Sequence, residues 1–277
     1  MQLHFTKMHG AGNDFVVIDA VSQTVSLTPQ QIRHLADRHY GVGCDQVLII
    51  EPPASDAVDF RYRIYNPDGG EAEQCGNGAR CFARYAHDRG LTPKTDIRVE
   101  SRGGIINQRI LSDGSVAVDM GTPRFEPRDI PFQADTAALA YTLDMEDGQS
   151  IELSALSMGN PHAVIEVDDV TDAPVDTLGA RLSTHPRFPN GVNVGFMQII
   201  DKGHIKLRVF ERGAGETLAC GSGACAAVAA GRRRAQLDSE VSVELPGGQL
   251  TVQWDGGDTP VWLTGPVTYV FEGRIEL

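Results

Sequence analysis

A repeated cysteine turn constrains the fold of this 277-residue chain more than any other feature. When residues 61–79 are set above residues 206–224 without a gap, Cys75-Gly76 coincides with Cys220-Gly221. The same alignment pairs further residues of one type: Arg63 with Arg208, Gly70 with Gly215 and Glu71 with Glu216. A duplicated stretch of this kind indicates two copies of one fold unit, and the chain is long enough for two domains of about 150 residues or fewer.

The local sequence pattern predicts a similar set of elements in each copy. Short segments rich in β-branched and aromatic residues, bounded by Gly, Pro, Asn or Asp, are typical of strands; they are 15–18, 47–50, 60–65, 163–167, 194–200 and 205–210. Helices are predicted at 29–38 with Thr28 as N-cap, at 79–89 closed by Gly90, and at 224–230 closed by Gly231. The last of these is apolar nearly all round and should be buried. We therefore predict an α+β fold with two pseudo-symmetric domains, each a mostly antiparallel sheet around a central helix, and an active site in the cleft between them.

The charge of the chain limits its partners. Its 24 Lys and Arg residues against 37 Asp and Glu residues give a formal net charge of −13, so neither a nucleic acid nor an anionic membrane surface is favoured. No stretch approaches the roughly 18 apolar residues of a spanning helix, and the first residues lack the order of a signal peptide. We expect a cytoplasmic protein that acts on a small molecule.

The cysteines differ in their sequence settings. An odd number, five, without a secretion signal indicates reduced thiols. Cys81 and Cys225 fall within predicted helices and are expected to be core residues. Cys75 and Cys220 precede the helices at glycine-flanked turns, where N–H groups and the helix dipole lower the pKa of a thiol. A zinc site is not favoured, because the spacing within each half places the two thiols on different helix faces.

An activated thiol in each of two matching halves suggests a two-base proton transfer. If the halves face each other, one thiolate removes a proton from a tetrahedral carbon and the opposite thiol delivers one to the other face, which inverts the stereocentre. N–H groups at residues 76–77 and 221–222 suit an α-carboxylate. None of the four lysines lies in a setting that suggests a Schiff base, and no dinucleotide or P-loop fingerprint is present. We therefore expect neither a cofactor nor a metal.

Six sequence blocks resemble a known family. In chain order they are Phe5–Phe15, Asp37–Gln46, Gln74–Arg84, Met158–His162, Val192–Val194 and Glu211–Ala224. They resemble the signatures of the diaminopimelate epimerases, in the group of cofactor-independent amino-acid racemases that includes proline racemase. The resemblance implies interconversion of LL- and meso-diaminopimelate, on the route to lysine and peptidoglycan, by the thiol pair Cys75 and Cys220. It also implies domains at 1–121 with 266–277 and at 122–265, and commonly a homodimer.

The resemblance further implies a set of site residues. The positions that match substrate-contacting residues of the family are Asn13, Gln46, Asn66, Asn160, Asn193, Glu211 and Arg212, and its carboxylate-binding turns match Gly76-Asn77 and Gly221-Ser222. His162 and Glu211 match positions proposed to tune the pKa of the thiols. At the second amino-acid end of the substrate, Arg212 would clamp a carboxylate and Glu211 would accept an ammonium.

Three positions depart from the family's usual pattern. Cys44 stands where an apolar residue is usual, so a third thiol is expected near the cleft. Asn190-Gly191 replaces a Glu-Arg pair, which is expected to loosen that loop. Phe271 occupies an aromatic position that is often tyrosine and is associated with dimer packing.

Three other functions remain open from the residues. A racemase for another amino acid would not need the distal amino-acid end of the substrate. A hydrolase would use Cys220 as nucleophile and His162 as base, and would tolerate Cys75→Ser. An amino-acid-binding module would keep its affinity without either thiol. The hydrolase and the binding module leave the duplication of the cysteine turn unexplained.

Overall fold

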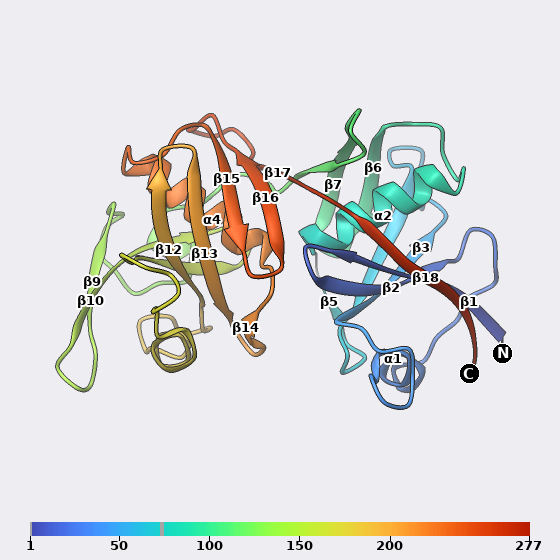
Figure 1. Cartoon of the computed structure of the whole chain (residues 1–277), viewed down its shortest axis with the longest axis horizontal. Helices are drawn as coiled ribbons and strands as arrows, with labels where there is room; N and C mark the ends of the chain where they lie inside the picture. Colours follow the sequence, from blue (N-terminus) through green and yellow to red (C-terminus); the bar gives the residue numbers. More distant parts are fainter. Residues whose placement is uncertain (1, 73–74) are drawn as a thin grey trace. The chain divides into compact units, whose positions relative to one another are not determined.

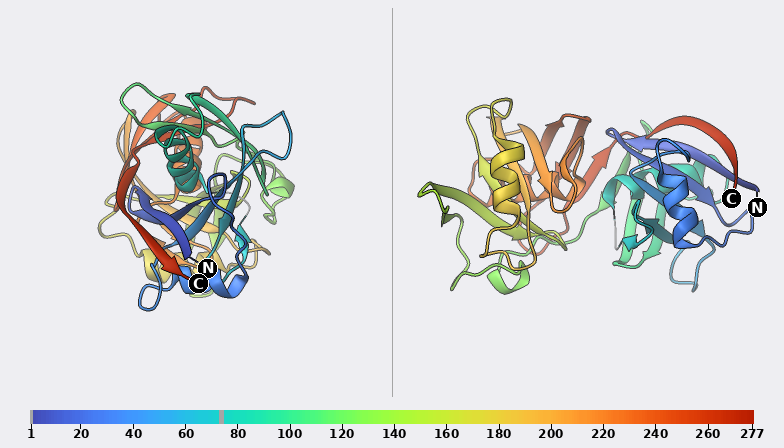
Figure 2. Two further views of the ribbon diagram at one scale, coloured as in Figure 1. Left: turned by 90° about the vertical axis from the view of Figure 1, so that its right-hand side faces the viewer. Right: turned by 90° about the horizontal axis from the view of Figure 1, so that it is seen from below.

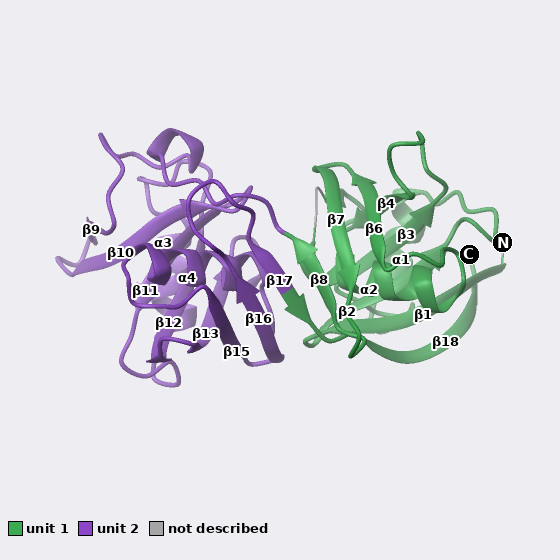
Figure 3. Cartoon of the chain, turned by 90° about the horizontal axis from the view of Figure 1, so that it is seen from above, with its two compact units in different colours: residues 1–119, 264–277 green, residues 120–263 purple. Residues whose placement is uncertain are grey.

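The computed structural model describes residues 2–72 and 75–277, and it divides into two compact units (Figure 3). Unit 1 comprises Met1–Asp119 and Thr264–Leu277, and unit 2 comprises Met120–Leu263. Each boundary lies two residues before the one expected from the sequence. No helix among the described residues is long and apolar enough to span a bilayer.

Unit 1 is built mainly from strands. Its elements are β1 (Gln2–Gly10), β2 (Asn13–Asp19), α1 (Pro29–Ala36), β3 (Gln46–Glu51), β4 (Phe60–Tyr65), β5 (Glu71–Ala72), α2 (Gly76–Asp88), β6 (Asp96–Ser101), β7 (Gly104–Ile110), β8 (Val116–Asp119) and β18 (Thr268–Glu276). The pairs β2–β3 and β4–β6 are parallel. The other unit-1 pairs, such as β1–β2 and β3–β4, are antiparallel. β18 runs beside β1 to the two chain ends, so the C-terminal segment completes this unit (Figures 1 and 2).

Unit 2 repeats this order of elements. They are η1 (Pro127–Asp129), β9 (Tyr141–Asp144), β10 (Ser150–Ser157), β11 (Pro161–Glu166), η2 (Val175–Gly179), α3 (Ala180–Ser183), β12 (Asn193–Asp201), β13 (His204–Glu211), β14 (Gly215–Thr217), α4 (Gly221–Arg233), β15 (Glu240–Leu245) and β16 (Gly248–Gln253); β17 (Trp262–Gly265) contains the boundary. Here β11–β12 and β13–β15 are the parallel pairs, as β2–β3 and β4–β6 are in unit 1. The repeat seen in the sequence is therefore a repeat of topology.

A central helix organises each unit. α2 contacts β1, β2, β3, β7 and β8, and α4 contacts β10, β11, β12, β13 and β16. In α2, Phe82 is fully buried and packs edge-on against Tyr62, with ring centroids 5.0 Å apart. Residues 223–231 of α4 are all buried, as its uniformly apolar sequence predicted. The predicted α+β class, with a mostly antiparallel sheet around a helix in each domain, is confirmed.

The helix ends differ from the prediction at several points. α2 and α4 begin at Gly76 and Gly221, three residues earlier than predicted, and α2 ends at Asp88 instead of Arg89. α4 continues through Gly231 to Arg233. A Cβ at Gly231 would lie 2.5 Å from the Leu237 side chain, so this glycine allows Leu237 to pack closely against the helix and does not end it. α1 ends at Ala36 and not at Arg38, because the carboxylate of Asp37 accepts the next backbone N–H groups and starts a turn. The predicted cap at Thr28 is confirmed, with reciprocal bonds to Gln31.

Candidate active site

In both units a cysteine lies directly before the first residue of the central helix. Cys75 is the N-cap of α2 and Cys220 is the N-cap of α4, each with extended backbone angles. The first helical bonds run from Ala79 N to Cys75 O (2.8 Å) and from Ala224 N to Cys220 O (2.9 Å). The backbone N–H groups of residues 76–78 and 221–223 therefore point out of the helix starts, where helix geometry favours an anion.

The unit 1 half-site gathers the amides predicted from the sequence around Cys75. Asn13 Oδ1 accepts a bond from Asn77 Nδ2 (3.2 Å) and one from Cys75 Sγ (3.7 Å). Beside them, Gln46 Nε2 donates to Asn66 Oδ1 at 2.9 Å. Cys75 is half-buried. The predicted residues of this half thus lie in two bonded groups, one joining the start of β2 to the start of α2 and the other joining the start of β3 to the residue after β4.

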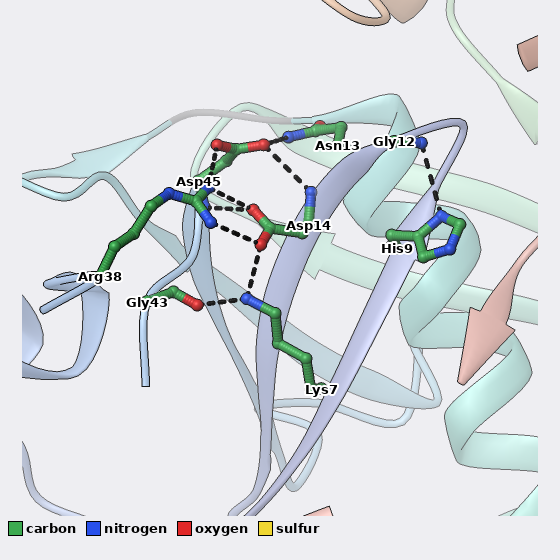
Figure 4. A network of polar contacts seen from close by, with 8 residues as sticks. All are labelled: Lys7, His9, Gly12, Asn13, Asp14, Arg38, Gly43 and Asp45. Carbon is green, nitrogen blue, oxygen red and sulfur yellow. Dashed lines mark hydrogen bonds and ion pairs between the residues drawn. The ribbon is translucent and has the colours of Figure 1, made fainter. Parts of the chain in front are cut away.

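A network of charged residues holds the Asn13 amide of this half-site (Figure 4). Asp45 Oδ2 accepts from Asn13 Nδ2 at 2.8 Å and from Asp14 N at 3.0 Å. Arg38 bonds both Asp45 Oδ1 (2.8 Å) and the carboxylate of Asp14, and buried Lys7 pairs with Asp14 at 2.6 Å. Burial by itself would raise the pKa of Asp14, but its bonds from Arg38 and Lys7 outweigh burial and hold the pKa well below its usual range.

The unit 2 half-site is a chain of hydrogen bonds that ends at Cys220. The Nε2 atom of His162 lies 3.0 Å from Asn160 Oδ1, and Asn160 Nδ2 donates to Ser222 Oγ at 3.3 Å. Ser222 Oγ lies 3.7 Å from Cys220 Sγ. His162 and Asn193 face each other in the parallel β11–β12 register, as Phe15 and Gln46 do in β2–β3.

Burial decides the protonation of His162 and Cys220, the two titratable groups of this hydrogen-bonded series. Burial lowers the pKa of His162 to about 3, helped by the charge of Arg212, so the imidazole is neutral near pH 7. Burial raises the pKa of Cys220 well above its usual value, and the nearby Glu211 anion raises it further against bonds from Ser222 and Gly223. The expectation that a helix start lowers the pKa of this thiol is therefore wrong, because Cys220 is only 4% exposed and desolvation dominates.

Glu211 is the last residue of β13 and Arg212 follows it, and both are bonded within the same unit. Thr217 Oγ1 donates to Glu211 Oε1 at 2.5 Å. Asn193 Oδ1 accepts from Arg212 N at 2.9 Å, and Asn193 Nδ2 donates to Pro161 O. Asn193 thus links Arg212 to the strand that carries His162, and Glu211 is held by β14.

The residues of the charged network were not among the predicted site residues. Lys7, Asp14, Arg38 and Asp45 all lie in the first two family-like blocks, but none was assigned a role. A carboxylate directly before Gln46 and another directly after Asn13 were the available signal, because they flank two predicted contact residues.

The comparisons with known proteins agree with one another. The sequence model described as diaminopimelate epimerase matches residues 5–126 and 154–270. The diaminopimelate epimerase of Azoarcus sp. (strain BH72) is 60% identical, and that of Ectopseudomonas mendocina (strain ymp) is 58% identical, each over the whole of both chains. The chain belongs to the diaminopimelate epimerase family.

Solved structures show that the fold of this family is shared more widely. A hydroxyproline epimerase from Agrobacterium vitis, solved with bound trans-4-hydroxy-L-proline, aligns with a TM-score of 0.71 at 17% identity over 99% of this chain and 92% of that one. A phenazine biosynthesis protein of the PhzF family from Bacillus anthracis aligns over both whole chains with a TM-score of 0.72 at 18% identity. These likenesses concern the fold alone.

This family member differs from expectation at two of its unusual positions. Cys44 is 2% exposed, and burial raises the pKa of its thiol to about 12, so it is a core residue and not an accessible third thiol. The 190–191 loop is tied to the site, because Arg212 Nη1 donates to Asn190 O and a Cβ at Gly191 would lie 2.8 Å from Arg212 Cδ.

Proposed function

We propose that the protein is a cofactor-independent epimerase that inverts one stereocentre of LL-2,6-diaminopimelate to give the meso form. The observation that carries the proposal is the duplicated thiol, since Cys75 and Cys220 cap the central helices of two units with one topology. Membership of the diaminopimelate epimerase family supports the substrate. The activity would serve lysine and peptidoglycan precursor synthesis in the cytoplasm.

The proposed reaction is a two-thiol proton transfer. The thiolate of one half removes the proton from Cα, and the electron pair left on Cα is delocalised into the adjacent α-carboxylate. N–H groups at residues 76–77 and 221–222 would stabilise the charge that develops on its oxygens. The thiol of the other half then donates its proton to the opposite face of Cα. The thiolate and thiol exchange roles in each turnover, so the reverse reaction uses them in reverse.

Burial of Cys220 favours the protonated thiol in the free protein, so forming its thiolate requires a change in its surroundings. A thiol whose pKa is raised by burial and by Glu211 is protonated in the free protein. The substrate ammonium that Glu211 binds would offset the Glu211 charge and make a thiolate less costly. We propose that ionisation of the thiol pair is coupled to substrate binding, and that neutral His162 acts through Asn160 and Ser222 and not through a positive charge.

The distal end of the substrate sets the specificity in this proposal. Arg212 would bind the distal carboxylate and Glu211 an ammonium, while the amides of Asn66, Asn160 and Asn193 distinguish its handedness without adding charge. Because the guanidinium already bonds Asn190 O, part of its geometry is set before the substrate binds.

Substrate specificity tests this function. In D2O, LL-diaminopimelate should exchange its Cα proton and give the meso form, whereas L-lysine, which lacks the distal carboxylate, should show no exchange by proton NMR. Arg212→Gln should raise the KM for diaminopimelate roughly 10- to 100-fold, since a charged hydrogen-bond donor is lost. Arg181→Gln is the matched control, because Arg181 pairs with exposed Asp147. Equal exchange with L-lysine would indicate a racemase of another specificity.

We also propose that the protein is a homodimer. The β18 segment exposes Tyr269, Val270 and Phe271 at 37%, 53% and 49%, an apolar stripe on an edge of unit 1, and Phe271 packs edge-on against Phe5. Sedimentation should give a dimer for the wild-type protein and a monomer for Phe271→Asp, with Leu139→Asp, at another exposed apolar position, as control. A wild-type monomer at micromolar concentration would contradict this.

A further inference from the structure

The side-chain amide of Asn13 is held in one orientation by the carboxylate behind it. An amide presents oxygen at one end and two N–H donors at the other, and its neighbours decide which end faces where. Asp45 is acceptor-only when ionised, so it requires Asn13 Nδ2 on its side, at 2.8 Å. Oδ1 therefore faces the α2 start, where it accepts from Asn77 and Cys75.

Asp45 is itself fixed by bonds that an asparagine could not all make. Its Oδ1 accepts a charge-assisted bond from Arg38, and its Oδ2 accepts both Asn13 Nδ2 and Asp14 N. Asp45 N in turn donates to Asp14 Oδ1 at 2.8 Å. The network in Figure 4 thus runs from two cations through two carboxylates to a single amide. The only donors that this network offers to Asp45 Oδ2 are Asn13 and Asp14.

We propose that Asp45, held by Arg38, is a positioning residue that fixes the Asn13 amide with its oxygen toward Cys75. This inference rests on the proposed function of Cys75 as one of the two proton-transferring thiols. An oxygen facing the sulfur accepts a bond from the thiol but repels the thiolate, so the orientation favours the protonated form of Cys75. A reversed amide would offer N–H donors and favour the thiolate.

The substitution Asp45→Asn should reverse the amide of Asn13. Arg38 will hold the oxygen of the introduced side chain, since the bond from a guanidinium is the strongest in the network. The NH2 group of the introduced side chain then faces Asn13, which can answer only with its own oxygen, while the backbone N–H of Asp14 loses its acceptor. Asn13 Nδ2 turns to Cys75 and stabilises the thiolate. Asp45→Ala also removes the carboxylate but supplies no donor, so it frees the amide without turning it.

The other titratable groups near Cys75 do not change their charge over the pH range of the measurement. Tyr62 and Cys81 interact with Cys75 from β4 and from α2, and both are fully buried. Burial raises the pKa of Tyr62 well above its usual value and that of Cys81 to about 12. Both stay neutral through the range in which a half-buried thiol titrates, and Asp14 stays ionised because its pKa lies far below that range.

The experiment measures alkylation of Cys75 by iodoacetamide against pH, with the modified peptide quantified by mass spectrometry. Relative to the wild-type protein, the midpoint for Asp45→Asn should fall by about one pH unit, and that for Asp45→Ala by clearly less. Asp59→Asn is the matched control, because Asp59 also accepts a backbone N–H, from Arg98, and a cation, from Lys94, but does not touch Asn13. Its midpoint should equal the wild-type value.

Two results would overturn the proposal. An unchanged midpoint in Asp45→Asn would show that the amide is not held by Asp45. Equal shifts in Asp45→Asn and Asp45→Ala would show an effect of charge alone. The kcat for diaminopimelate should fall about tenfold in Asp45→Asn. Thermal unfolding of each variant confirms that it folds. If the wild-type protein does not turn over diaminopimelate, the proposed function fails while the alkylation profiles still test the role of Asp45.

Discussion

Replacing either Cys75 or Cys220 by alanine should lower the rate of diaminopimelate epimerisation by roughly 10³-fold or more. Each thiol is the acid in one direction and the base in the other, so neither can compensate for the other. The rate is measured by NMR or chiral chromatography on purified single variants. Thermal unfolding midpoints within a few degrees of the wild-type protein would show that the loss is chemical.

A cysteine in the same helix provides the control. Cys81 lies in α2, fully buried, six residues after Cys75. Cys81→Ala should lower the free energy of unfolding by about 1 kcal/mol, as a small core deletion does, and leave kcat near its original value. Epimerisation that survives in Cys75→Ala but not in Cys220→Ala would contradict the two-thiol mechanism and leave Cys220 as the one essential thiol.

Gly78→Ala should lower the free energy of unfolding by about 1–3 kcal/mol, as overpacking of a tight core does. Gly78 lies in the first turn of α2, and a Cβ there would overlap Tyr62 Oη and lie 3.2 Å from Leu48. A methyl group has no room until the tyrosine moves. Chemical denaturation of the purified variant measures the loss.

A second substitution identifies the cause of that loss. Tyr62 Oη is buried and has no hydrogen-bond partner among residues 2–72 and 75–277. Tyr62→Phe should therefore be neutral or slightly stabilising, and it should reduce the cost of Gly78→Ala to below about 1 kcal/mol. Costs that simply add in the double variant would contradict a clash with the hydroxyl.

Much of the fold follows from local sequence. Short runs of β-branched and aromatic residues mark β2, β3 and β4 within one or two residues of their observed ends, and the 61–79 and 206–224 repeat anticipates the shared topology. Gly231 shows the limit of this reasoning, because a glycine near the end of an apolar run reads as a stop signal. Only the position of Leu237 reveals that it serves packing.

The sequence points to candidate site residues but not to their electrostatics. The repeated cysteine turn singled out Cys220, yet the helix-start argument gave the wrong direction for its pKa because the depth of burial is not readable from a Gly-flanked turn. Asp45 was overlooked for a similar reason. Its role depends on a bond to Asn13, 32 positions earlier in the chain, which forms only when β2 and β3 pair.

The central claim, that two thiols act on opposite faces of one carbon, is tested most directly by where deuterium first appears. LL-diaminopimelate is incubated in D2O with the reduced wild-type protein without added cofactor, and the reaction is followed by proton NMR from its first few per cent. Deuterium is expected at Cα of the meso product well before it enters the remaining LL substrate. The proton taken by one thiolate returns to its own face, while the other thiol delivers deuterium from solvent. Early deuterium in LL substrate and product alike would indicate a single exchangeable base and contradict the account.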